Sequence, residues 1–306
     1  MKTISSLRKT MRHKILYRHW QPGDDDAILE MLVPSGQLSS ENSYRNKFRD
    51  WSVEAEGICL AFVGGKAVGH VLGMSDSFLV EKKIQKFGCV GLVYVDPNTR
   101  QQGIATHLMH QLHAYFQKKG YRGSILDTDE EAAIRLYQKV GYQQLTQDLQ
   151  TQLPPNQNAS QLKWAEVNLS DLSALPQLDE MWARQNFPVS CDRQSIKVHQ
   201  YNMGGYRILR RGQNIIGYAR WDEPSEYRPY GLIRDPIVPE TDPLEVITSV
   251  QAAIPTTRTW EAAEGGRYEE PLRACGCTFE PTTTVIMLSS FGQEIDLTGY
   301  HRTAWW

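Results

Sequence analysis

The chain has 306 residues, of which 22% are charged and 41% are hydrophobic, and its formal net charge is −2. This nearly neutral balance gives no basic field for nucleic acid, and no apolar run approaches the length of a membrane span. The length accommodates two domains of ordinary size, each with its own hydrophobic core.

The N-terminal residues and the cysteines favour a cytoplasmic protein without a metal. Residues 1–13 are basic, but no apolar segment follows them, so we expect a flexible N-terminal segment rather than a secretion signal. Five cysteines are scattered along the chain, and Cys275 and Cys277 have neither the spacing of a redox pair nor a second pair for zinc. We therefore expect reduced, buried thiols.

The first part of the chain predicts short strands and helices in alternation. A strand at residues 15–18 precedes a helix that begins after Pro22-Gly23-Asp24 with acidic residues in its first turn. A second amphipathic helix is expected over residues 39–51, because aromatic residues recur there at helical spacing. Residues 58–73 predict a hairpin whose turn is Gly64-Gly65.

Residues 87–117 form the most informative stretch. The apolar run over residues 89–95 has the composition of a strand, and a helix with a regular apolar face begins at Ile104. Gly103 lets an anion approach the first turn of that helix, whose N–H groups lack partners, and Arg100 adds positive charge. The pattern therefore predicts a phosphate-binding site, although an ordinary turn between a strand and a helix would have the same local sequence.

A further strand at residues 124–127 and a helix over residues 130–140 complete this part of the chain. Gly141 follows the helix at the C-cap position.

Two motifs resemble those of the GNAT acetyltransferase superfamily. The run from Leu92 to Pro97, followed by Arg100-x-x-Gly103-x-Ala105, resembles the acetyl-coenzyme A signature of that family, with Ala105 in place of a second glycine. Ala133-x-x-Leu-Tyr137-x-x-x-Gly141-Tyr142 resembles a later helix of the family, although Glu130 stands where an asparagine is common.

The resemblance implies an α/β (α+β) fold with a mixed, mostly antiparallel central sheet, a splayed parallel strand pair and flanking helices. It implies acetyl-coenzyme A as cosubstrate and no metal. Tyr137 takes the place of the general acid. The residues implied in cofactor binding are the strand residues Val93, Tyr94 and Val95 and the loop and helix residues Arg100, Gln101, Gln102, Gly103, Ile104, Ala105 and Thr106.

The second half repeats the first in outline. Low apolar content and adjacent prolines over residues 148–160 predict a linker, so we expect an acetyl-coenzyme A-binding domain at 14–150, a linker at 151–162 and a degenerate GNAT-like domain at 163–306. The loop Pro239-Glu-Thr-Asp-Pro243 has no Arg-x-x-Gly pattern and carries two acids, so it should repel coenzyme A.

Each candidate for proton transfer also has a plainer structural interpretation. Tyr137 could be a core tyrosine whose hydroxyl is satisfied locally, but its place in the motif favours the acid role. The strand 87–95 has no carboxylate to act as a base. Asp127 and Asp129 could act through water, although capping of the next helix is the favoured interpretation. His70 is expected to be a packed or half-exposed histidine.

The resemblance therefore implies an N-acetyltransferase that acts on an amine of a small molecule or peptide. The alternatives are a coenzyme A-binding sensor or interaction protein without turnover, and acyl transfer to a hydroxyl or thiol. Neither nucleic acid nor a membrane is expected as partner, and a homodimer stays open. Trp305-Trp306 is expected to dock on the surface, and a terminal carboxylate that reaches the active site is the less favoured alternative.

Overall fold

The computed structural model describes residues 14–48, 53–80, 83–156, 160–166, 189–190, 205–224, 229–234, 236–295 and 297. The segment 1–13, expected to be flexible, and the C-terminal Trp305-Trp306 lie outside these residues, as does Cys191.

The first half contains the strands and helices that the sequence predicts, with longer strands. The strands are β1 (Ile15–His19), β2 (Val53–Val63), β3 (Lys66–Val80), β4 (Lys83–Val95), β5 (Ser124–Thr128) and β6 (Gln143–Leu153). The helices are α1 (Asp25–Leu32), α2 (Glu41–Phe48), the 3-10 turn η1 (Pro97–Thr99), α3 (Ile104–Lys118) and α4 (Glu131–Lys139).

The second half contains seven strands and two helices among the described residues. The strands are β7 (Leu162–Glu166), β8 (Val189–Ser190), β9 (Gly205–Arg211), β10 (Asn214–Asp222), β11 (Leu232–Arg234), β12 (Arg258–Ala263) and β13 (Glu280–Ser289). The helices are α7 (Pro243–Ala253) and α8 (Glu269–Ala274).

All of these strands join in one continuous sheet. Its order is β1-β2-β3-β4-β5-β13-β6-β12-β11-β10-β9-β7, and β8 pairs with β3 outside this path. The pairs β4–β5 and β11–β12 are parallel, and the other pairs are antiparallel. The predicted fold class, a mixed and mostly antiparallel sheet flanked by helices, is confirmed.

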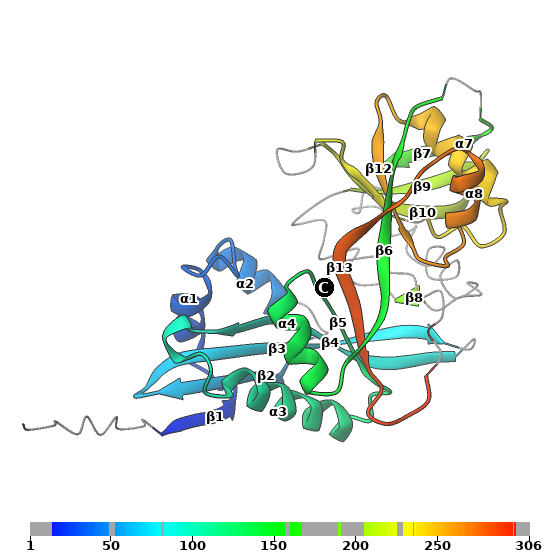
Figure 1. The fold of residues 1–306 in the computed structure, drawn as a ribbon. Helices are drawn as coiled ribbons and strands as arrows, with labels where there is room; N and C mark the ends of the chain where they lie inside the picture. Colours follow the sequence, from blue (N-terminus) through cyan, green and yellow to red (C-terminus); the bar gives the residue numbers. More distant parts are fainter. Residues whose placement is uncertain are drawn as a thin grey trace, which may run out of the picture.

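The two halves exchange strands at their junction. β13 lies between β5 and β6, and β6 in turn lies between β13 and β12. Figure 1 shows these two long strands running side by side from one half to the other. The sheet of the first half is therefore completed by the last described strand of the chain.

The prediction that the linker begins near residue 148 is wrong, because residues 148–153 continue β6. Two polar side chains of this strand find acceptors in β13 or just before it. Thr151 Oγ1 donates to the Thr278 carbonyl over 2.7 Å, and the Gln147 amide donates to the Thr282 carbonyl. A polar composition therefore does not require a loop here. The order of elements from β9 to β13 also matches that from β2 to β6, although the division into domains stays a prediction.

Helices cover both faces of the first half's sheet (Figure 1). On one face, Ile28 and Leu32 of α1 pack with Leu72 and Phe87 of the sheet. On the other face α3 lies close to the strands, because Gly73 and Gly88 leave room for the ring of Phe116. A Cβ atom would lie 2.9 Å from this ring at Gly73 and 2.3 Å from it at Gly88. These glycines fix the position of α3, and hence of its N-terminus.

Candidate functional site

The parallel strands β4 and β5 separate after a short pairing. β4 pairs with β5 only at Gly88 and Cys89, whereas its pairing with β3 continues to Val95. In the described chain, no strand pairs with the β5-side edge of β4 over residues 90–95. Val93, Tyr94 and Val95 lie on this edge and are half-buried. Backbone N–H and C=O groups on such an edge are available to an extended ligand.

A β-bulge in β4 lies beside this opening. His70 pairs with Tyr94 and Leu72 pairs with Gly91, so one residue of β3 opposes two residues of β4, Leu92 and Val93. Leu92 has a φ of +48°, in the left-handed region that non-glycine residues rarely adopt. The sequence has no glycine at position 92, so it does not predict this conformation.

The loop after β4 leads directly to an open helix N-terminus. Asp96 accepts a hydrogen bond from the Asn98 N–H and thereby caps η1, and Arg100 Nε donates to the Val95 carbonyl over 3.1 Å. Gly103 is the N-cap of α3, with a φ of +77°, and no side chain caps the helix. A Cβ atom built on Gly103 would meet nothing within 4 Å.

The predicted phosphate-binding residues surround this helix N-terminus. Arg100, Gln101, Gln102 and Gly103 are exposed, whereas Ala105 and Thr106 are half-buried and Ile104 is buried. The N–H groups of the first helical turn therefore face an accessible loop and carry the positive end of the helix dipole. These residues fit a phosphate, which such N–H groups bind.

Tyr137 lies in α4 with its ring in the core. It is 6% exposed and packs edge-on against Tyr142, with ring centroids 5.8 Å apart. Burial raises the pKa of Tyr137, and the charges of Asp127 and Glu130 raise it further. The hydroxyl therefore keeps its proton at neutral pH. It makes no hydrogen bond within the described part of the chain. Tyr137 is therefore not a core tyrosine whose hydroxyl has a hydrogen-bond partner nearby.

The prediction that Asp127 and Asp129 cap the following helix is wrong. Glu130 is the N-cap of α4, and no side chain caps that helix. The Glu130 N–H instead bonds to Thr128 Oγ1 over 3.2 Å. Asp127 lies at the end of β5 and is half-buried. Burial raises the pKa of Tyr137 and of Cys89 most, and the charge of Asp127 adds to both shifts. Asp127 follows the two residues of β5 that pair with β4.

His70 is packed, as expected. Its side chain is 1% exposed, and burial lowers its pKa to about 4. Nδ1 lies 2.8 Å from the Leu92 carbonyl oxygen, in the bulge of β4. Sequence reasoning did not connect this histidine with the opening, because the bulge itself has no sequence signal.

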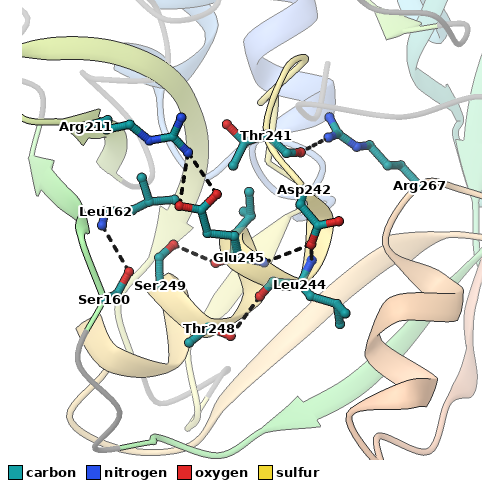
Figure 2. Close-up of polar contacts among 11 residues, drawn as sticks. Ser160, Leu162, Arg211, Thr241, Asp242, Leu244, Glu245, Thr248, Ser249 and Arg267 are labelled. Carbon is teal, nitrogen blue, oxygen red and sulfur yellow. Dashed lines mark hydrogen bonds and ion pairs between the residues drawn. The ribbon is translucent and has the colours of Figure 1, made fainter.

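In the loop before α7 in the second half, a side chain caps the helix. Figure 2 shows Asp242, whose side chain accepts hydrogen bonds from Leu244 N at 2.9 Å and Glu245 N at 3.3 Å. Glu245, in the first turn of α7, pairs with Arg211 at 2.8 Å, and Arg267 donates to the Thr241 carbonyl. A carboxylate thus occupies the place that the open N-terminus of α3 offers to a ligand.

A cavity of about 710 Å³ was not predicted from the sequence. It lies between the C-terminal end of α4 and the turn after β13, and His113 lines it. His113 Nε2 lies 3.0 Å from the Tyr142 hydroxyl, which lies 2.6 Å from Ser124 Oγ. Burial, with a smaller contribution from His110, lowers the pKa of His113 to about 4.

The described part of the chain has neither a metal-binding group nor a membrane-spanning helix. None of its groups of His, Cys, Asp and Glu could hold a metal ion. None of its helices is long and apolar enough to cross a membrane.

The sequence matches the model of the Acetyltransferase (GNAT) family over residues 26–142. No curated protein matches the chain.

Solved structures share its fold. The structure is similar to GCN5-related N-acetyltransferases from Kribbella flavida, with a TM-score of 0.66 at 11% identity, and from Anabaena variabilis, with 0.66 at 15%. The alignments cover 90% of this chain and 71% and 72% of those chains. Eis1 from Mycobacterium abscessus is similar with a TM-score of 0.62 at 14% identity, over 91% of this chain and 74% of that one.

Proposed function

We propose that the chain transfers an acetyl group from acetyl-coenzyme A to an amine of a small molecule or peptide, because residues 26–142 match the model of the Acetyltransferase (GNAT) family. The observation that carries this proposal is the open edge of β4 beside the uncapped N-terminus of α3. The two features are separated only by residues 96–103 and would together bind an extended ligand that ends in phosphates.

The cosubstrate would lie along this surface. The first turn of α3 and the loop from Arg100 to Gly103 would hold the pyrophosphate, since their N–H groups are uncapped and Gly103 presents no side chain. Backbone groups of Val93, Tyr94 and Val95 would pair with the pantetheine arm. Ile104, Ala105 and Thr106 contribute the N–H groups of the helical turn itself.

The chemistry would take place where β4 and β5 separate. The amine nitrogen attacks the thioester carbonyl carbon, and N–H groups of the β4 edge stabilise the negative charge that develops on its oxygen. The C–S bond then breaks, and Tyr137 gives its proton to the leaving sulfur. The proton of the amine passes to water, and we assign Asp127, near the end of β5, as the carboxylate that receives it through that water. The resulting tyrosinate recovers a proton from solvent.

We further propose that each chain binds a single coenzyme A, because Asp242 occupies the N-terminus of α7. The second half would instead complete and support the first. β13 fills the first half's sheet, and β8 pairs with the outer part of β3. Leu297, after β13, is buried in the same hydrophobic core as Ile28 and Leu32 of α1.

The test is thiol release from acetyl-coenzyme A by the full-length chain with a panel of amines. Release that depends on an amine supports the proposal. Tight coenzyme A binding without release with any amine, alcohol or thiol would favour the alternative of a coenzyme A-binding sensor. Release with alcohols or thiols alone would indicate another acceptor class.

A further inference from the structure

The β-bulge of β4 brings together a strained backbone and a buried histidine. Leu92 adopts a φ of +48°, a conformation that costs free energy in any residue with a side chain. A bulge also turns one carbonyl out of the regular ladder of the sheet. Such a conformation persists only where neighbouring groups hold it in place.

His70 supplies a hydrogen bond at this point. Its Nδ1 lies 2.8 Å from the Leu92 carbonyl oxygen. A carbonyl oxygen only accepts, so Nδ1 carries the hydrogen and Nε2 is the unprotonated nitrogen of a neutral ring. Gly69 and Gly73 of the same strand face α3, so the alternation of the strand places His70 on the opposite face, which α1 covers.

The rest of the ring's surroundings argue against a role in packing alone. Nε2 is buried and has no hydrogen-bond partner in the described structure. A buried acceptor without a partner costs free energy, and an apolar side chain of similar size would fill the space without that cost. The hydrogen bond to Leu92 is what a histidine adds here.

The bulge also determines which backbone groups reach the open edge of β4. Before it, Gly91 pairs with Leu72. After it, Tyr94 pairs with His70, so the register has shifted by one residue. In a strand, such a shift exchanges the groups that face the two edges and the side chains that face the two sides. The residues after the bulge are Val93, Tyr94 and Val95, which the proposed function assigns to the pantetheine arm.

We propose that His70 is a positioning residue that holds the Leu92 bulge and thereby sets the backbone groups of residues 93–95 for acetyl-coenzyme A. This inference rests on the proposed function, because it concerns the same binding edge. His70 acts through the β4 backbone and does not itself touch the reacting atoms.

Two substitutions separate this role from simple packing. His70→Leu keeps the apolar bulk and removes the donor. His70→Asn keeps a donor, since its amide nitrogen occupies nearly the place of Nδ1. In the free full-length chain, hydrogen exchange measured by mass spectrometry on peptides spanning residues 90–95 reports the bulge directly. Titration with coenzyme A reports the binding edge, at a temperature where melting curves show that each variant is folded.

We expect His70→Leu to speed exchange in this segment about 10-fold or more and to weaken coenzyme A binding about 10-fold, with His70→Asn within about 3-fold of wild type in both. A His70→Leu variant with unchanged exchange and affinity would overturn the proposal, even if its melting temperature fell. So would a His70→Asn variant as impaired as His70→Leu. If His70→Leu does not fold, His70→Asn and His70→Ser decide: only the first should retain wild-type exchange. A wild-type chain that does not bind coenzyme A would refute the proposed function, while the exchange comparison would still decide whether His70 holds the bulge.

Discussion

Replacing Tyr137 by phenylalanine tests the proposed chemistry most directly. The change removes one oxygen atom and leaves the ring in its place against Tyr142. Within the described structure this oxygen makes no hydrogen bond, so none is lost. The free energy of unfolding should therefore change by less than about 0.5 kcal/mol.

The effect on the chemical step should be much larger. A positioned general acid is typically worth 10²–10⁴-fold, but a thiol of pKa about 8.5 leaves readily without full protonation. We therefore expect the rate of thiol release to fall roughly 10–100-fold, which corresponds to about 1.4–2.7 kcal/mol of activation free energy. The loss should grow at high pH, where water supplies fewer protons to the departing sulfur.

Single-turnover thiol release measures the chemistry, and a coenzyme A titration measures binding separately. Tyr142→Phe is the matched control, because its hydroxyl contacts both His113 and Ser124 in the core. That variant should lose about 1–3 kcal/mol of stability and keep its rate of thiol release. Equal single-turnover rates for Tyr137→Phe and wild type would remove Tyr137 from the mechanism.

Three further measurements test the anion site, the stoichiometry and the buried histidines. Coenzyme A at ~100 times its dissociation constant should add about 2.7 kcal/mol of stability, and Gly103→Glu should abolish the resulting shift in melting temperature. Gly120→Glu, the same change at a positive-φ glycine beyond the other end of α3, should keep it, and a Gly103→Glu variant that shifts as wild type does would contradict the loop assignment. Calorimetry should give one coenzyme A per chain. Two sites per chain would refute the proposal that Asp242 blocks the N-terminus of α7. The free energy of unfolding should be highest above pH 6.5 and fall as the pH drops toward 4, because His70 and His113 bind protons more readily in the unfolded chain than in the folded one. Each histidine contributes at most about 3 kcal/mol to this fall. Substituting both by leucine should make the free energy of unfolding depend less on pH.

Local patterns predicted the elements of the site well. The helix that begins at Ile104, the hairpin around Gly64-Gly65 and the helix ending before Gly141 all lie where glycine and apolar spacing indicated. The resemblance to the GNAT family is confirmed over residues 26–142. These features depend on near neighbours in the chain, whose influence a sequence shows directly.

The features that sequence reasoning missed depend on distant partners. The polar strand β6 has side-chain hydrogen-bond partners in β13 and just before it, more than 120 residues later, so its composition alone indicated a linker. The left-handed conformation of Leu92 is supported by His70, 22 residues earlier, and no glycine marks it. Asp127 and Asp129 precede a helix as capping residues do, yet the chain places the Glu130 N–H on Thr128 instead.

The strand exchange has a consequence for how the protein is made. Gln147 in β6 bonds to Thr282 in β13, 135 residues later in the chain. During synthesis at roughly 5–20 residues per second, the ribosome needs on the order of ten seconds to cover that interval. Until then the facing edges of β5 and β6 have no β13 between them, and unpaired edges invite pairing with other chains. The chain is therefore most prone to aggregate while its second half is still being synthesised. A chaperone that covers those edges during synthesis should raise the yield of folded protein more than one that acts after release.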